Sequence, residues 1–151
     1  MSDMYTVVGK MSGTPTPPAT ILMIVAAATK RCWLHELHIG TQNGSALAGT
    51  VISVGRPTTA GTGGAAYTPL PEDTSAPASL FTAVSSSTAW SAEPTQPGTY
   101  IWQQGLDAVA SYIWVPKTPI IVPVNGRLAV RVEADQSGTK VQWVATAIVE
   151  E

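Results

Sequence analysis

Residues 119–133, PIIVPVNGRLAVRVE, decide the fold class of this 151-residue chain. Apolar side chains alternate with mostly charged ones along Arg127–Glu133, which predicts a strand with one buried face. The inward-facing side chains are then Leu128, Val130 and Val132. Just before this strand, Asn125-Gly126 is typical of a two-residue hairpin turn. Because proline is disfavoured in central strands, we expect Pro119–Pro123 to lie at a sheet edge.

The composition extends this β pattern to the whole chain. Val, Ile and Thr number 15, 9 and 19, and β-branched side chains fit a pleated, half-buried surface. Thirteen glycines and 12 prolines interrupt every long stretch that a helix would need. We therefore predict an all-β fold, a single-domain antiparallel β-sandwich that is jelly-roll-like and has about eight strands.

Two segments stand apart from the rest of the predicted sandwich of residues 19–151. Residues 1–18 hold a short strand candidate, Met4–Met11, and a proline-rich connector, and we expect them to form an N-terminal arm. Residues 56–99 form a long loop excursion with six prolines and only four charged residues. Structureless loops of this length are uncommon, so we expect the excursion to be functional, locally folded or held by a partner.

Charge and hydropathy exclude several classes of protein. Eight Lys and Arg and ten Asp and Glu are scattered singly, without the basic stripe of a nucleic-acid binder. The best apolar window, Ala19–Ala28, is too short to span a bilayer, so we expect no membrane partner. Charged residues make up only 12% of the chain, which predicts that part of its surface is covered by another protein.

No residue pattern in the chain predicts catalysis. Hydroxyl nucleophiles need an activating base, and Gly61–Gly64 lacks the lysine of a phosphate-binding loop. Four carboxylates would be candidates for glycoside hydrolysis, but surface acids without a catalytic role explain them better; they are Glu72, Asp73, Glu93 and Asp107. The single cysteine, Cys32, is expected to be an ordinary buried thiol. We expect neither an enzyme nor a cofactor.

His35, Glu36 and His38 are the only residues that cluster as metal ligands do. On a regular strand His35 would share the core-facing side with Leu37 and Ile39, and the other two would face away. Two ligands on one face fall short of the three or four that zinc needs, so no metal site is predicted. We interpret the cluster as a polar patch facing solvent or another subunit; a metal shared about a symmetry axis is the alternative.

Three aromatic residues are further interface candidates. Trp90 lies in the polar surroundings of the excursion, where it either anchors a partner or plugs the core. Tyr100 and Trp102 follow at the start of the next expected strand. Exposed aromatic rings of a β-sandwich can seat in a partner's pocket or stack on sugars, so the three residues are compatible with either kind of binding.

Several short motifs follow one another from Gly55 to Val130, within the longer stretch of residues 19–149. They are Gly55-Arg56, Gly63-Gly64, Thr68-Pro69-Leu70, Glu72-Asp73, Ala76-Pro77-Ala78, Pro119-Ile120-Ile121-Val122-Pro123 and Arg127-Leu128-Ala129-Val130. In this order the pattern resembles the small jelly-roll head decoration (cement) proteins of tailed bacteriophages.

The resemblance implies a homotrimer that is made in the host cytoplasm and bound to the major capsid protein at the capsid surface of the virion. It carries over no catalytic or binding residue. We therefore expect a structural capsid decoration protein that stabilises the shell. The alternative is a receptor- or glycan-binding module of a phage fibre or tail.

Overall fold

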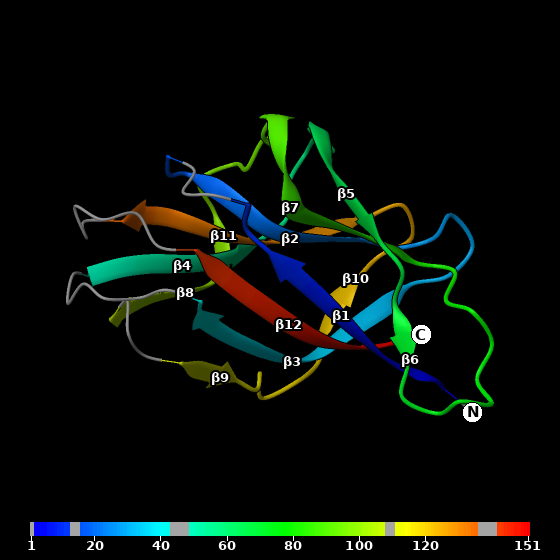
Figure 1. Cartoon of the computed structure of the whole chain (residues 1–151). Helices are drawn as coiled ribbons and strands as arrows, with labels where there is room; N and C mark the ends of the chain where they lie inside the picture. The colour runs from blue at the N-terminus through cyan, green and yellow to red at the C-terminus, as the bar shows by residue number, and fades with distance from the viewer. Residues whose placement is uncertain (1, 13–15, 43–48, 108–110, 136–141) are drawn as a thin grey trace.

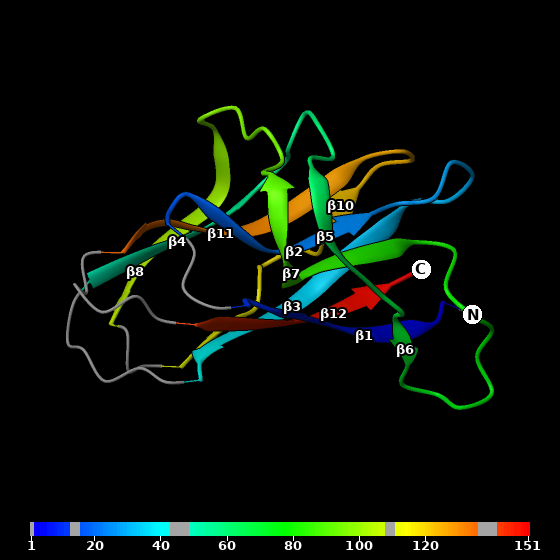
Figure 2. The same ribbon diagram turned by 45° about the horizontal axis from the view of Figure 1, so that its top comes forward.

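The computed structural model describes residues 2–12, 16–42, 49–107, 111–135 and 142–151. These residues form 12 β-strands in two antiparallel sheets, which pack face to face as a β-sandwich (Figures 1 and 2). The predicted all-β sandwich is confirmed, with 12 strands in place of about eight. Across these described segments, no helix is long and apolar enough to cross a membrane.

The first sheet, sheet A, has the strand order β10-β3-β12-β1-β6, and β9 also pairs with β3. Its strands are β1 (Met4–Lys10), β3 (Cys32–Thr41), β6 (Leu70–Pro71), β9 (Tyr112–Trp114), β10 (Ile120–Val122) and β12 (Trp143–Glu150). The second, sheet B, has the order β5-β7-β2-β11-β4-β8. Its strands are β2 (Ala19–Val25), β4 (Gly49–Gly55), β5 (Thr62–Tyr67), β7 (Thr82–Ala92), β8 (Tyr100–Asp107) and β11 (Arg127–Asp135).

Residues 119–133 join the two sheets. Leu128, Val130 and Val132 of β11 are buried in the core, as their alternation predicts, and β10 lies at an edge of sheet A. The hairpin expected at Asn125-Gly126 is wrong, because β10 and β11 belong to different sheets. The turn is closed instead by the Gly126 amide, which donates to the carbonyl oxygen of Pro123 at 2.7 Å.

The segment expected to be an N-terminal arm contains an inner strand. β1 pairs with β12 on one side and with β6 on the other. Its alternate side chains Tyr5 and Val7 are buried in the core. At Gly9 the sheets nearly touch, since a Cβ there would lie 2.5 Å from Leu22 Cβ of β2. Burial of every second residue therefore makes the described part of β1 integral to the sandwich.

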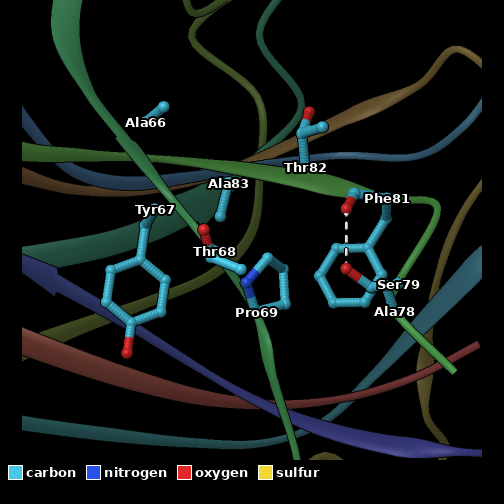
Figure 3. A pocket seen from close by; sticks show the side chains of 9 residues that line it. All are labelled: Ala66, Tyr67, Thr68, Pro69, Ala78, Ser79, Phe81, Thr82 and Ala83. Atoms are coloured by element: carbon cyan, nitrogen blue, oxygen red, sulfur yellow. Dashed lines mark hydrogen bonds between the residues drawn. The ribbon is translucent and has the colours of Figure 1, made fainter. Parts of the chain in front are cut away.

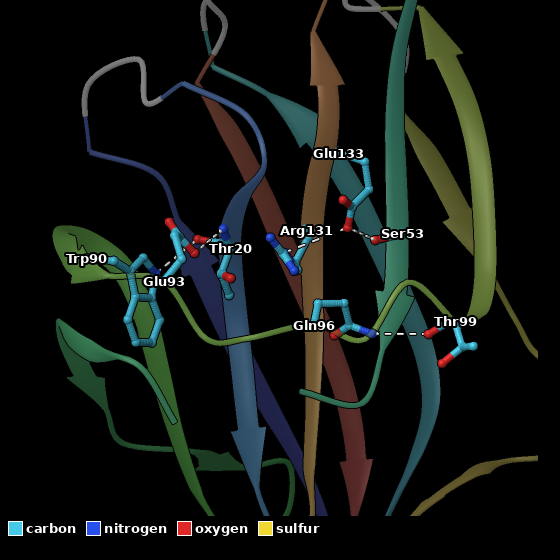
Figure 4. A network of polar contacts seen from close by, with 8 residues as sticks. All are labelled: Thr20, Ser53, Trp90, Glu93, Gln96, Thr99, Arg131 and Glu133. Carbon is cyan, nitrogen blue, oxygen red and sulfur yellow. Dashed lines mark hydrogen bonds and ion pairs between the residues drawn. The ribbon is translucent and has the colours of Figure 1, made fainter. Parts of the chain in front are cut away.

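Residues 56–99, expected to be a loop excursion, contain three strands, β5, β6 and β7. β5 and β7 pair at one edge of sheet B, and between them the chain crosses to sheet A, where β6 pairs with β1. After β7, residues 93–99 pass over the outer face of sheet B, as Figure 4 shows, and we call this segment the strap. So long a segment was expected to be functional, locally folded or held by a partner. The structure shows that part of it is locally folded.

Candidate docking face

The two sheets differ in what covers their outer faces. Along β1 and β12 of sheet A, burial alternates, so one face packs into the core and the other meets solvent. In sheet B, outward-facing residues such as Met23, Ala129 and Arg131 are also buried. The strap lies over this side of sheet B (Figure 4). Sheet A is thus the sheet whose outer face is accessible to a partner.

A polar network holds the strap in place, and Figure 4 shows its members. The Thr20 amide donates to Glu93 Oε2 at 2.9 Å. Gln96 Nε2 donates to the Thr99 carbonyl oxygen at 3.2 Å, and the Gln96 side chain fills the space next to Gly55. Beside the strap, Glu133 Oε1 accepts from Ser53 Oγ at 2.6 Å and lies 3.7 Å from Arg131 Nε (Figure 4).

A β-bulge in β3 decides which side chains reach the outer face of sheet A. Leu34 pairs with Val149 and Glu36 with Ile148, so His35 is the extra residue between them. The bulge reverses the side-chain alternation, and Leu34 is buried before it and Leu37 after it.

His35, Glu36 and His38 are therefore all half-buried on the outer face. The expectation that His35 shares the core-facing side with Leu37 is wrong, because that expectation assumed a regular strand.

Two imidazole–carboxylate pairs occupy this part of the face. His35 Nε2 lies 2.5 Å from Glu150 Oε2, and His38 Nε2 lies 2.5 Å from Glu36 Oε1. A hydrogen bond from Ser2, together with the neighbouring His35, outweighs burial and holds the pKa of Glu150 below its ordinary value. Within the described residues, no group of three or more His, Cys, Asp or Glu side chains is placed to hold a metal ion.

The strand register places apolar side chains beside these pairs. Direct partners in an antiparallel sheet project to the same face. His38 lies opposite Ile113 of β9 on one side and Thr146 of β12 on the other, and Thr146 lies opposite Val8 of β1. These four side chains form one row across β9, β3, β12 and β1. Ile113, at the β9 end of the row, is a large apolar side chain that is 57% exposed.

Two further rows complete the surface. Glu36, Ile148, Thr6 and Leu70 follow one another across β3, β12, β1 and β6. Ile121 of β10 lies opposite Trp33, whose ring carries the Arg31 guanidinium 6.0 Å from its centroid. We call this surface the open face; it comprises Thr6, Val8, Trp33, His35, Glu36, His38, Leu70, Ile113, Ile121, Thr146, Ile148 and Glu150. Leu70 and Ile121 are 56% and 43% exposed, which places large apolar side chains near both ends of the sheet.

The three aromatic candidates lie outside the open face. Trp90 Nε1 donates to the Thr20 carbonyl oxygen at 3.1 Å, and its ring packs beside Gly64. Trp102 stacks on Tyr112 and Trp114, with ring centroids 5.7 and 4.9 Å apart, between β8 of sheet B and β9 of sheet A. Tyr100 remains 37% exposed, and burial raises the pKa of its phenol, helped by Glu133.

One pocket of about 280 Å³ opens between the end of β5 with the residues that follow it and the start of β7 (Figure 3). It is lined by Ala66, Tyr67, Thr68, Pro69, Ala78, Ser79, Phe81, Thr82 and Ala83. Apart from the Tyr67 phenol, these side chains carry no ionisable group. The lining offers small apolar groups and hydroxyls, which suit packing or hydrogen bonding more than proton transfer.

The candidate carboxylates hold local structure. Glu72 Oε1 accepts from Thr6 Oγ1 at 3.3 Å, and Asp73 Oδ1 accepts from the Ser75 amide at 2.8 Å, which lowers the pKa of Asp73. Glu93 fixes the strap, and the side chain of Asp107 lies outside the described part of the chain.

No protein-family model, curated protein or solved structure matches the chain. Its function is therefore argued from the open face.

Proposed function

We propose that the chain is a structural decoration (cement) protein of a tailed bacteriophage. It binds the major capsid protein on the outer capsid surface as an oligomer, a homotrimer as the resemblance implies, and stabilises the shell of the virion. The observation that carries the proposal is the open face of sheet A. The proposal assigns the chain no catalytic step and no cofactor.

The shape of the open face favours docking on a broad surface. A protein that reinforces a shell needs contact area and complementarity more than a deep pocket. The open face extends over β10, β9, β3, β12, β1 and β6, and it mixes exposed apolar side chains with hydroxyls. Ile113, Ile121 and Leu70 are spaced across it, so apolar contact with a partner would be spread from one edge of the sheet to the other.

The carboxylates on the open face have partners within the chain. Glu150 is hydrogen-bonded to His35, and Glu36 is hydrogen-bonded to His38. Burying an unpaired charge in an interface costs free energy. Burying a carboxylate that already has a partner costs less free energy of desolvation. This arrangement supports a face that becomes covered.

Rigidity of the supporting sheet also favours this role. Behind the open face, Trp143, Leu37 and Val7 are fully buried, and β3, β12 and β1 pair along most of their length. A surface held by such a core changes little on binding, so little conformational entropy is lost when it docks.

The alternative, a receptor- or glycan-binding module, has less support from the aromatic side chains. Sugar binding uses ring faces that are free to stack on the ligand. Trp102 already stacks on two rings of its own chain, and Trp90 is held by its hydrogen bond to Thr20 and its packing beside Gly64. Glycan-array binding that Trp90→Ala abolishes would favour this alternative over the capsid proposal.

A matched pair of variants tests the proposal on undecorated capsids. Ile113→Asp places a charge on the open face, and Thr88→Asp places the same charge on an exposed position of β7 in sheet B. In a co-sedimentation titration, we expect Ile113→Asp to weaken capsid binding by about tenfold or more and Thr88→Asp to leave it unchanged. Equal capsid binding by both variants would contradict the proposal that the open face contacts the capsid.

A further inference from the structure

The edges of the two sheets differ in how well they are protected. An edge strand exposes a row of unpaired N–H and C=O groups that accept another strand, unless proline, charge, bulges or shortness prevent it. Within the described residues, the edge strands are β6, β9 and β10 in sheet A and β5 and β8 in sheet B. Four of these five strands carry such protection.

In sheet A every edge strand is short. β6 has two residues, one of them Pro71. β9 and β10 have three residues each, and β10 lies between Pro119 and Pro123. In sheet B, β5 has an irregular register to β7, with Gly63 and Gly64 at φ values of 89° and 74°. None of these four edges presents a long, regular row of backbone groups.

β8 is different. It has eight residues, contains no proline, and carries no charged side chain from Tyr100 to Leu106. Its register to β4 shifts once, at Ile101, and is regular from Trp102, opposite Val54, to Asp107, opposite Gly49. In the part of the chain that is described, β4 is its one pairing partner. Trp102 of β8 also stacks on Tyr112 and Trp114 of β9, which ties this edge of sheet B to sheet A. The contact holds β8 in an extended conformation.

We infer that β8 is a self-association edge, which pairs antiparallel with β8 of a second copy of the chain. A two-fold axis perpendicular to the sheet keeps inner faces with inner faces. With the axis at Gln103, the two copies of Gln103 lie opposite each other, and Trp102 lies opposite Gln104. The two copies of sheet B then form one continuous sheet.

The side chains of β8 select a second copy over a charged partner. Like charges directly opposite each other destabilise a strand pair, and two copies of this edge bring none together between Tyr100 and Leu106. At the centre, Gln103 is exposed, and its amide can donate to and accept from the same group of its twin. An acidic or basic peptide would find no opposite charge on this stretch.

The inference goes beyond the proposed function, because the edge of sheet B and the open face of sheet A are separate surfaces. Pairing through β8 leaves Ile113, Ile121 and Leu70 uncovered by the shared sheet. It is also compatible with a trimer, because a two-fold contact can join copies that belong to neighbouring trimers.

Sedimentation velocity of purified protein over a concentration series tests the inference. We expect the wild type to form dimers, or hexamers if the chain is trimeric. Gln103→Lys places like charges at the axis and should weaken this association by roughly tenfold or more. Thr88→Lys adds the same charge to an exposed position of β7 and should have no effect. An equimolar mixture of Gln103→Lys and Gln103→Glu should restore association.

Two outcomes would overturn the inference: a wild type that stays monomeric or purely trimeric at every concentration, or equal effects of Gln103→Lys and Thr88→Lys. Capsid co-sedimentation separates this result from the proposed function. A wild type that binds capsids but does not associate in solution contradicts only the inference, and a wild type that associates in solution but does not bind capsids contradicts only the proposed function.

Discussion

His35 Nε2 lies 2.5 Å from Glu150 Oε2, at the β-bulge that turns His35 out of the core and onto the open face. A hydrogen bond from Ser2 to Glu150, together with this pair, makes stability depend on pH. The pKa of Glu150 is held below its ordinary value of 4.5, so its carboxylate stabilises the fold above that pH. The contribution is lost as the pH falls through the lowered value, where the carboxylate takes up a proton.

Glu150→Gln should therefore flatten the acid limb of the stability curve. We expect the variant to be less stable than the wild type near neutral pH, by less than about 1 kcal/mol since the pair is partly exposed. The difference should shrink below the ordinary pKa of the carboxyl. Urea unfolding midpoints over a pH series measure it, and a difference that stays constant with pH would contradict this role of Glu150.

Gly9 lies at a close approach of the two sheets. A Cβ at this position would lie 2.5 Å from Leu22 Cβ and 2.7 Å from the Ile21 carbonyl oxygen. Gly9→Ala should thus lower the free energy of unfolding by about 1–3 kcal/mol through overpacking. Gly49→Ala is the matched control, because no atom of the described residues that are not its chain neighbours lies within 4 Å of its Cβ position. Thermal unfolding measures the stability of both variants. Equal melting temperatures would contradict the close contact between Gly9 and Leu22.

Glu93 anchors the strap through the Thr20 amide. The bond is 2.9 Å long and partly buried, so Glu93→Ala should cost about 1.5–3 kcal/mol of stability. Glu72→Ala removes a longer, exposed bond of 3.3 Å to Thr6 and should cost less than about 0.5 kcal/mol. Chemical denaturation compares the two variants, and a larger loss for Glu72→Ala would show that the strap is held in another way.

The Cys32 thiol should be unreactive in the folded chain. Burial, followed by the charge of Glu151, raises its pKa to about 12, and the thiolate is the reactive form. Near pH 8 we expect alkylation by iodoacetamide to be about a thousandfold slower than in denaturant. Mass spectrometry follows the modification over time. Labelling at similar rates in both conditions would mean that Cys32 is accessible.

Strand alternation made the centre of the fold predictable. Leu128, Val130 and Val132 of β11 are buried as expected, and Pro119 and Pro123 mark β10 as an edge. The same period of two runs through Tyr5 and Val7, which are buried in an inner strand. That signal was present in the sequence, but a short terminal strand next to a proline-rich connector also fits an arm.

The features that escaped prediction depend on distant contacts. An extra residue at His35 leaves no local mark, because only the register against Ile148 and Val149 reveals the bulge. β5 and β7 consist mainly of Gly, Ala, Ser and Thr, so they lack apolar alternation. Arg131 does face away from the core, as expected, but the strap side of sheet B buries it to 5% exposure. Candidate residues were thus found by type, and the fold decided which of them share a surface.

Saturation of undecorated capsids with the wild-type protein tests the central claim most directly. The number of bound copies per capsid is measured by quantitative gel analysis of sedimented shells as the protein concentration rises. The account predicts a plateau at a fixed ratio to the major capsid protein, together with shells that resist heat longer. Binding that never saturates, or no binding at all, would contradict it.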